Sequence, residues 1–305
     1  KAGTMNIDFM KGKKRLFTHP YTLNEREESS ANRGSFGSND VIYLLMPDRF
    51  ANGDTSNDNL PGMTEQLNRS DPGGRHGGDL KGIINHLDYL NGLGVTGIWL
   101  NPFLENNQLH SSYHGYSTTD FYRADPRYGS NDEFRDLVTE AHKRGMKVVM
   151  DMIFNHIGSF HWWMKDLPSK DWIHQFEEFT RTNYRASTYL DPYTSERDKM
   201  LMEKGWFDVT MPDLNQSNPL VETYLIQTSL WWIAFSDLDG IRMDTYPYPQ
   251  PDMMARWARR VGEEFPGFFI VGEVWYDDPS QISYWALNKE NSDGYRSYLP
   301  SVTDF

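Results

Sequence analysis

Short, continuous apolar runs alternate along the chain with segments whose apolar residues recur at helical spacing. The runs at residues 41–46, 96–100 and 147–154 carry no alternating polar positions, which is typical of strands buried on both faces of a parallel sheet. Two further runs end at Asp244 and at Glu273, and residues 301–305 have the pattern of a sixth strand. The chain is therefore expected to form a mainly parallel sheet.

Four segments between these runs have the apolar spacing of helices that cover a sheet. A helix near residue 131 begins at Asn131-Asp132-Glu133 and ends at Gly145, and another spans about 221–235. The apolar face of the helix at 131–145 is formed by Phe134, Leu137, Val138 and Ala141, and the faces of the two remaining helices are formed by Ile83, Ile84, Leu87 and Leu90 and by Met254, Trp257, Ala258 and Val261. Repeated strand–helix units predict an α/β fold.

The order of these units predicts a TIM (β/α)8 barrel that is truncated before its last strands. Residues 40–156 and 211–305 are assigned to this partial catalytic barrel. Residues 157–210 are aromatic, charged and aperiodic, and they are interpreted as an inserted domain B after the third strand. Residues 1–39 are polar and are expected to be the irregular tail of an N-terminal module followed by a linker.

Two carboxylates follow parallel strands and should meet at the rim where an α/β barrel carries its chemistry. Asp244 ends the run 240–244, and Glu273 ends the run 268–273. Arg242 lies two residues before Asp244, so both side chains should point to one face of the strand. A pair of carboxylates flanking a scissile bond is what glycoside hydrolysis requires. The simpler interpretation is a structural ion pair between Asp244 and Arg242.

Composition limits the classes of partner. The net charge of −13 disfavours nucleic acid, and no apolar run among the 305 residues is long enough to span a membrane. The chain has no cysteine, which excludes disulfides and thiolate metal sites. Ten Trp and seventeen Tyr suit the apolar faces of sugar rings, although a large core would also use them.

Several motifs together resemble the α-amylase family of glycoside hydrolases over residues 40–305. Three resemble family signatures in the right order: Asp151 to His156, Gly240 to Thr245, and Gly272 to Trp275. The segments His114-Gly-Tyr116, Asp120-Phe-Tyr122 and Arg127-Tyr-Gly129 resemble a further motif on the substrate side. The segment Met211-Pro-Asp-Leu-Asn215 is similar to the corresponding segment in the neopullulanase and cyclomaltodextrinase branch.

The resemblance implies a role for six side chains. Asp244 would be the nucleophile that forms a glycosyl-enzyme, and Glu273 the general acid and then base, with the two carboxyls about 5–5.5 Å apart. Glu273 would need a raised pKa, while Arg242 would hold Asp244 ionised. The remaining three are expected to bind substrate: Tyr116 stacks on the sugar ring, and Asp151 and His156 orient the sugar and the arginine.

Two departures from the family pattern are visible. The fourth signature, a strand-end His-Asp pair, does not occur before Phe305, which leaves open whether this polypeptide is active alone. Many amylases carry Lys and His three and four residues after the nucleophile, where this chain has Pro247 and Tyr248. The usual interdomain calcium site is therefore not expected.

A different calcium site is expected between residues 48 and 58. The turn concentrates carboxylate and amide oxygens, which calcium prefers, but its spacing is not that of an EF-hand. It resembles the N-terminal calcium loop of cyclodextrin glycosyltransferases, and by that resemblance the ligands are Asn52, Asp54, Asn57, Asp58, Gly77 and Asp79. The alternative is an Asn/Asp/Gly turn that binds no metal.

The function expected from these observations is retaining hydrolysis of α-1,4-glucosidic bonds in cyclodextrins, maltooligosaccharides or pullulan. The alternatives are a non-catalytic amylase-like glucan-binding protein, and a transglycosylase or isomerase that uses the same intermediate. The insertion contains six aromatic side chains close to the expected rim: Phe160, His161, Trp162, Trp163, Trp206 and Phe207. If they line the pocket, they favour compact substrates. The alternative is that they form a small core within the insertion.

The partners expected are α-glucan oligosaccharides, with neither nucleic acid nor a membrane span, and self-association as a homodimer stays open. The chain starts at Lys1 without a charged-then-apolar leader, which indicates a processed protein or a fragment. A periplasmic or secreted bacterial enzyme is one interpretation of this start.

Overall fold

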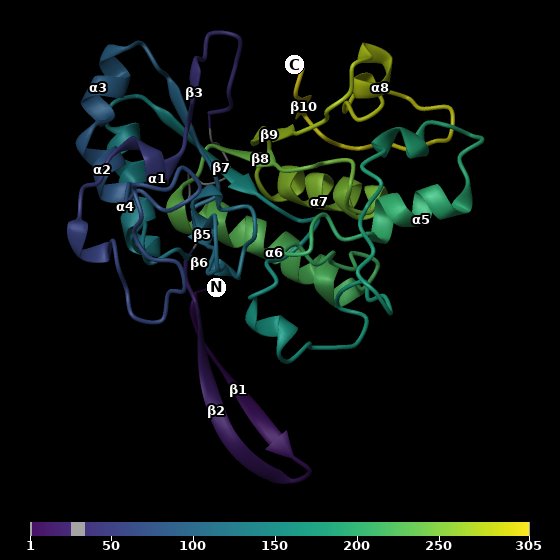
Figure 1. Cartoon of the computed structure of the whole chain (residues 1–305), viewed down its shortest axis with the longest axis horizontal. Helices are drawn as coiled ribbons and strands as arrows, with labels where there is room; N and C mark the ends of the chain where they lie inside the picture. The colour runs from purple at the N-terminus through teal and green to yellow at the C-terminus, as the bar shows by residue number, and fades with distance from the viewer. Residues whose placement is uncertain (1, 26–33, 305) are drawn as a thin grey trace.

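The computed structural model describes residues 2–25 and 34–304, and its centre is a six-stranded parallel sheet (Figure 1). The strand order is β10-β9-β8-β7-β4-β3. The strands are β3 (Ile42–Leu45), β4 (Gly97–Leu100), β7 (Lys147–Met152), β8 (Gly240–Met243), β9 (Phe269–Gly272) and β10 (Ser301–Val302). The six strands expected from the apolar runs are therefore all present.

Each of these strands pairs in parallel with the next one along the chain, as repeated βα units require. In the register of β7 and β8, Asp151 lies opposite Arg242. The ladder then continues past the strands: the Asp244 N–H donates to the carbonyl of the last residue of β7 at 2.8 Å, and the Glu273 N–H donates to that of β8 at 2.9 Å. The backbone thus brings these four residues to one rim.

Helices cover the sheet (Figure 1). They are α1 (Pro47–Phe50), α2 (Leu80–Asn85), α3 (Leu87–Gly92), α4 (Asn131–His142), α6 (Pro219–Ser236), α7 (Pro251–Glu264) and α8 (Pro279–Ser283). A capping box starts α4, because the Ser130 hydroxyl accepts the Glu133 N–H while the Glu133 carboxylate accepts the Ser130 N–H. The single helix expected through Ile83 and Leu90 is divided at His86, whose backbone leaves the helical conformation.

The core lies between the sheet and the helices α4, α6 and α7. Trp232 and Trp257 are fully buried, and each indole N–H has a partner: the Phe121 carbonyl for Trp232 and the Ser229 hydroxyl for Trp257, both at 2.8 Å. Burial of both the ring and its bonded N–H makes each tryptophan a favourable core residue. In the part of the chain that the structure describes, no helix is long and apolar enough to cross a membrane.

The strand β3 departs from its expected burial. Its continuous apolar run predicts a strand covered on both faces, yet Ile42, Tyr43 and Leu44 are 40%, 39% and 51% exposed. The reason is its position: β3 pairs only with β4 and forms one edge of the sheet, while β10 forms the other. Within the described residues the sheet curves without closing, so only Leu45 of this strand is buried.

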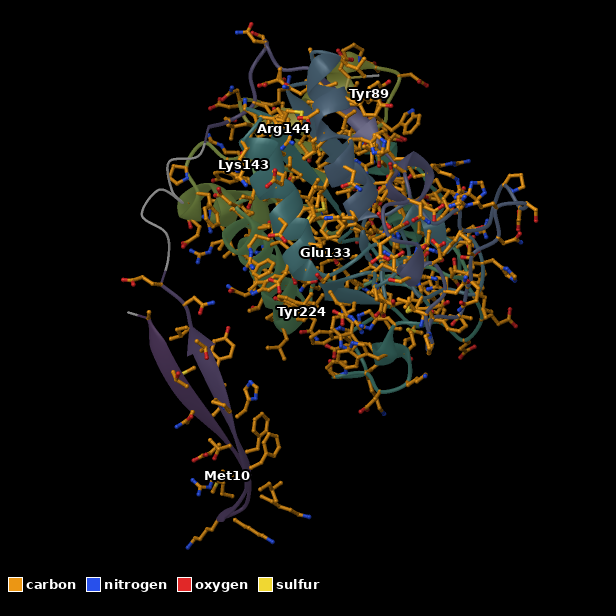
Figure 2. All side chains as sticks on the ribbon, turned by 90° about the vertical axis from the view of Figure 1, so that its left-hand side faces the viewer. Met10, Tyr89, Glu133, Lys143, Arg144 and Tyr224 are labelled. Atoms are coloured by element: carbon orange, nitrogen blue, oxygen red, sulfur yellow. The ribbon has the colours of Figure 1, made fainter. Side chains whose placement is uncertain are left out.

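The N-terminal segment also differs from the expectation of an irregular tail. Strands β1 (Gly3–Lys11) and β2 (Lys14–Leu23) form an antiparallel hairpin that projects from the barrel (Figures 1 and 2). Both strands are exposed along their whole length, and Phe9 stacks on Phe17 with centroids 4.3 Å apart. The overlooked signal is the alternation of Met5, Ile7 and Phe9 with polar residues before a Gly12 turn. The expected linker lies partly at 26–33, outside the described residues.

Residues 157–210 form an irregular insertion, consistent with the pattern of the sequence. Their regular elements are two short 3-10 helices, η4 (Trp162–Met164) and η5 (Ala186–Tyr189), and one α-helix, α5 (Glu196–Lys204). Other short elements precede them between β3 and β7: η2 (Thr55–Asn57), η3 (Ser112–His114), and the antiparallel pair β5 (Leu104–Glu105) and β6 (Asp120–Ala124). The start of the insertion is anchored at the rim, because the Gly158 N–H donates to the Thr118 carbonyl at 2.7 Å and the Ile157 N–H donates to the Pro212 carbonyl at 3.0 Å.

Candidate active site

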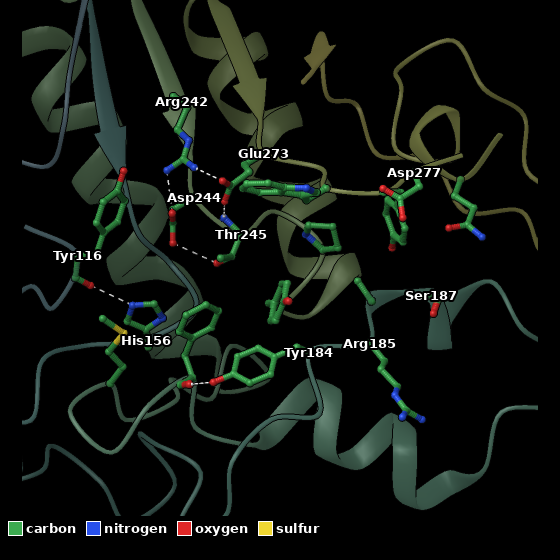
Figure 3. Close-up of a pocket in the computed structure, with 18 of the residues that line it drawn as sticks. Tyr116, His156, Tyr184, Arg185, Ser187, Arg242, Asp244, Thr245, Glu273 and Asp277 are labelled. Atoms are coloured by element: carbon green, nitrogen blue, oxygen red, sulfur yellow. Dashed lines mark hydrogen bonds and ion pairs between the residues drawn. The ribbon is translucent and has the colours of Figure 1, made fainter. Parts of the chain in front are cut away.

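One buried guanidinium organises the rim of the sheet. Arg242 Nη1 lies 2.7 Å from Asp244 Oδ1, and its Nη2 lies 2.6 Å from Glu273 Oε1 (Figure 3). The same Nη1 lies 2.8 Å from Asp151 Oδ1. Strands β7, β8 and β9 each contribute to this cluster, which explains why the parallel register determines its geometry. The expectation that Arg242 and Asp244 share a face is confirmed. The simpler interpretation, a structural ion pair between these two residues, is incomplete, because three carboxylates converge on the arginine.

Asp151 is the most enclosed of these carboxylates. Its Oδ2 accepts hydrogen bonds from the Trp99 indole at 3.1 Å and from the Tyr116 hydroxyl at 3.2 Å, while Oδ1 binds Arg242. Trp99, on β4, is a site residue that the sequence motifs do not include. Asn101 adds a further bond, donating to the Tyr116 hydroxyl at 3.3 Å. Each partner of the Asp151 carboxylate is a donor, so the surroundings are built for its ionised form.

His156 supports Tyr116 rather than Arg242. Its Nε2 bonds the Tyr116 carbonyl at 2.9 Å, and its Nδ1 lies 3.3 Å from the Asn155 amide nitrogen (Figure 3). Because a carbonyl only accepts, Nε2 carries the proton and Nδ1 accepts from Asn155. His156 thus holds the loop of Tyr116 at the cavity, whereas the sequence motif led us to expect it to orient the arginine.

Burial sets the protonation of the carboxylates. It raises the pKa of Asp151 to about 7 against the opposing charge of Arg242. Burial also raises the pKa of Glu273, with the Asp244 charge adding to the effect, as a general acid requires. The pKa of Asp244 is raised by burial as well, and Arg242 only opposes this. Arg242 acts on Asp244 in the expected direction, towards the ionised form, and the burial of Asp244 opposes it.

The cluster forms the floor of a cavity of about 940 Å³ (Figure 3). Its walls come from the barrel loops and from the insertion, and they contain several residues that the motifs do not include: Tyr184, Arg185, Ser187, Tyr248, Tyr276, Asp277, Asp278 and Gln281. A cavity of this size with a few convergent polar groups is typical of small-molecule sites. All six expected catalytic and substrate residues are near it: five line the cavity, and Asp151 lies beneath it, bonded to Arg242 and Tyr116.

The aromatics of the insertion divide between core and cavity. Phe207 lines the cavity and stacks on His156 with centroids 5.3 Å apart. Trp163 is buried against Trp172, and Trp206 donates its indole N–H to the His174 carbonyl, so these side chains stabilise the insertion. His161 is buried beside Trp163, while Phe160 and Trp162 are 46% and 56% exposed and do not line the cavity. The interpretation as a small core holds for three of the six side chains, His161, Trp163 and Trp206, and the interpretation as pocket lining holds for Phe207.

The expected calcium loop is folded around Asp79. Its carboxylate accepts from the backbone N–H groups of Gly53, Asp54 and Gly82 and from the Asn57 side-chain amide. A Cβ on Gly77, whose φ is +82°, would lie 2.3 Å from Asp58 Oδ1. The backbone at Gly77 therefore approaches the Asp58 side chain closely.

Two oxygens of this loop have no partner. Asn52 Oδ1 and Asn57 Oδ1 are buried without a hydrogen bond, beside the carboxylates of Asp58 and Asp79. Unsatisfied buried oxygens next to carboxylates fit a hard cation. Asp54 does not share this arrangement, because its exposed carboxylate caps η2 through Ser56. Nowhere in 2–25 or 34–304 do three His, Asp or Glu side chains form a metal cluster, so any ion here would need amide and carbonyl ligands.

Comparison with known proteins agrees with this geometry. The family model of the α-amylase catalytic domain matches residues 44–299. The chain belongs to the α-amylase family. It is 35% identical over 275 residues to neopullulanase 2 of Thermoactinomyces vulgaris, and 34% identical over 301 residues to the cyclomaltodextrinase of Thermoanaerobacter pseudethanolicus. These matches cover 85% and 95% of the chain, but 42% and 48% of the relatives.

Solved structures confirm the fold class. An Anoxybacillus α-amylase superposes with a TM-score of 0.72 at 36% identity, covering 88% of the chain and 52% of that structure. The expected barrel, with helices around a parallel sheet, is therefore confirmed. The chain spans about half the length of the curated relatives it matches, or less.

The buried, neutral state of His156 predicts a specific dependence of stability on pH. Burial lowers the pKa of His156 from 6.5 to about 4, so the unfolded chain binds a proton in this range that the folded chain does not. His156 therefore contributes stability above pH 6.5 that is lost as the pH falls towards 4. The measurement is urea unfolding between pH 6.5 and 4.5. The slope of unfolding free energy against pH should be smaller in the His156→Gln variant than in the parent protein, by up to ~1.4 kcal/mol per pH unit.

The control for this measurement is His110→Gln, because His110 is on the surface. This variant should keep the slope of the parent protein. An unchanged slope in His156→Gln would mean that His156 is protonated in the folded protein, and the assignment of its tautomer would then be wrong.

Proposed function

We propose that this chain carries the catalytic centre of a retaining α-glucan hydrolase. The observation that carries the proposal is that the guanidinium of Arg242 contacts both Asp244 and Glu273 at the floor of a cavity. Two carboxyls held by adjacent nitrogens of one arginine are close enough to act on opposite sides of one bond. For a retaining enzyme we expect the carboxyls about 5–5.5 Å apart, against about 6.5–9.5 Å for an inverting one.

The two steps use these side chains in turn. In the first, an oxygen of Asp244 bonds to the anomeric carbon while the glycosidic bond breaks, and the proton of Glu273 passes to the departing sugar oxygen. In the second, water attacks the same carbon, its proton returns to Glu273, and the bond to Asp244 breaks. The raised pKa of Glu273 suits the first step, since the acid must be protonated before it donates.

The relatives support an α-glucan as substrate. Their names include neopullulanase and cyclomaltodextrinase, and we propose α-1,4-glucosidic bonds of cyclodextrins, maltooligosaccharides or pullulan for this protein. Transfer to a second sugar in place of water uses the same intermediate and is the alternative within enzymes. A protein that only binds glucan is disfavoured, because binding alone requires neither a buried nucleophile nor an acid with a raised pKa.

Removal of the nucleophile tests the central proposal. In the full-length protein, Asp244→Asn should lower kcat by at least about 10³-fold, because an amide cannot form the glycosyl ester. Glucan binding, measured by calorimetry, should persist. Asp136→Asn, the same change at an exposed aspartate on α4 that does not line the cavity, is the control and should retain turnover. Substantial hydrolysis by Asp244→Asn would show that another group is the nucleophile.

Substrate preference follows from the shape of the cavity. Phe207, Tyr184 and Tyr248 contact one another at one wall, with centroids 5.2–6.5 Å apart, and could cover the apolar face of a curved glucan. We expect kcat/KM of the full-length protein to be higher for β-cyclodextrin and pullulan than for soluble starch. The measurement compares the three substrates under one condition. A clear preference for starch would contradict this part of the proposal and leave the catalytic assignment intact.

The loop at 52–58 is proposed to bind calcium, which proteins of this family often do. Asn52, Asn57, Asp58 and Gly77 are the ligands that the structure favours, with Asp79 organising the loop. The ion would neutralise the Asp58 carboxylate and join this loop to the start of α2, so its role would be stability.

Calcium binding can be tested with a pair of aspartates in one loop. After removal of metal by a chelator, added calcium chloride should raise the unfolding temperature of the parent protein by several degrees. Asp58→Asn should abolish this rise. Asp54→Asn, which changes an exposed cap nearby, should retain it. If chelation and calcium leave the parent unfolding temperature unchanged, the loop is a metal-free turn.

A further inference from the structure

Thr245 follows the proposed nucleophile directly and has an unusual backbone conformation. Its φ is +42°, in the left-handed region that β-branched residues rarely adopt. The residue is half-buried and lines the cavity. Such backbone strain persists only where the surroundings determine it, and it is concentrated at functional sites.

The direction of the Thr245 N–H follows from the strand that precedes it. Successive N–H groups of a strand point to opposite neighbours, and the Asp244 N–H is bonded to β7. The Thr245 N–H therefore faces β9, where it meets a carboxylate: it donates to Glu273 Oε2 at 2.9 Å (Figure 3). The buried Tyr246 then returns to the ladder, donating its N–H to the Glu273 carbonyl at 3.0 Å.

The side chain of Thr245 contacts the other carboxylate. Its hydroxyl donates to Asp244 Oδ2 at 3.2 Å (Figure 3). Arg242 binds the remaining oxygen of each acid, Asp244 Oδ1 and Glu273 Oε1. Each carboxyl is consequently held at both oxygens, one by the arginine and one by the threonine. Fixing both oxygens fixes the plane of a carboxyl as well as its position.

We propose that Thr245 is a positioning residue that sets the orientation of the nucleophile and of the acid/base relative to each other. This inference rests on the proposed function, because it assigns those roles to Asp244 and Glu273. The two donors are separable: the hydroxyl acts on Asp244 alone, and the backbone N–H acts on Glu273 alone. Removing the hydroxyl should therefore impair the nucleophile and leave the acid in place.

The effect of this change on pH dependence has a definite sign. A donor to a carboxylate favours its ionised form, so loss of the Thr245 hydroxyl should raise the pKa of Asp244. The other charged or titratable groups that face Asp244 stay unchanged in such a variant; they are Arg242 on β8, Asp151 on β7, Glu273 after β9, and the hydroxyls of Tyr116 and Tyr248. The acidic limb of the rate profile should move, and the alkaline limb should not.

The test compares Thr245→Val, which keeps the branched shape and removes the hydroxyl, with Thr245→Ser, which keeps the hydroxyl. In the full-length protein, Thr245→Val should lower kcat on a maltooligosaccharide about 10- to 100-fold with little change in KM. Its acidic limb should rise by about 0.5–1 pH unit. Thr245→Ser should recover most of the activity and the parent pH profile.

A substrate with a good leaving group separates the two carboxyls. Cleavage of α-maltosyl fluoride needs a nucleophile but little protonation of the leaving group. Thr245→Val should lose as much activity on the fluoride as on the oligosaccharide, whereas Glu273→Gln should retain much more activity on the fluoride. This pattern would place the defect of Thr245→Val at Asp244.

Three results would overturn the inference: Thr245→Val within about threefold of the parent, Thr245→Ser as impaired as Thr245→Val, or unimpaired cleavage of the fluoride by Thr245→Val. The first comparison is valid even where valine destabilises the turn, since serine tests the hydroxyl independently. An Asp244→Asn variant, measured in parallel, distinguishes failure of this inference from failure of the proposed function. If that variant is inactive while Thr245→Val is normal, only the role of Thr245 is wrong.

Discussion

The site depends on the burial of one positive charge among three negative ones. Arg242 is 3% exposed, and it binds Asp244 at the end of its own strand, Asp151 on β7 and Glu273 at the end of β9. Burial alone would lower the pKa of the guanidinium, but the carboxylates outweigh this and raise it. Removing the guanidinium would leave three buried carboxyls without a compensating positive charge in a medium that solvates them weakly, which is strongly unfavourable.

The same imbalance explains the chemistry that the site can support. Three carboxyls compete for one guanidinium, so burial and mutual repulsion raise the pKa of the acids, and a proton can be held among them. In the proposed hydrolysis a sugar develops positive charge beside Asp244, and the negative groups would then be favourable neighbours of that charge. The excess of negative charge is thus unfavourable in the protein without substrate and becomes favourable beside an oxocarbenium-like transition state.

The sequence predicts those site residues whose positions are determined by the hydrogen-bonded register of the parallel strands. The ends of the apolar runs place Asp151, Arg242, Asp244 and Glu273 at one rim, because side-chain alternation and parallel register leave little freedom there. Trp99 and Thr245 could not be found this way. The first reaches the site through a long side chain from a neighbouring strand, and the second through a turn whose left-handed backbone no apolar pattern marks.

The two errors in the fold have a common physical origin. Apolar runs and apolar alternation report local preference, whereas burial depends on which neighbours cover a strand. The run in β3 predicts a strand correctly and its burial wrongly, because it lies at the edge of the sheet. The hairpin β1–β2 was missed because its apolar alternation is short and its polar content high.

The insertion reaches the catalytic rim at Phe207 and Tyr184. Phe207 stacks on His156, whose ring holds the backbone of Tyr116, and the Tyr116 hydroxyl bonds Asp151. Tyr184, at a φ of +56°, lies beside Phe207 and donates its hydroxyl to the Phe207 carbonyl. A continuous chain of contacts therefore runs from the insertion to the carboxylate beneath Arg242. The insertion therefore forms part of the cavity wall and also contacts, through His156 and Tyr116, the residues that surround the buried acids.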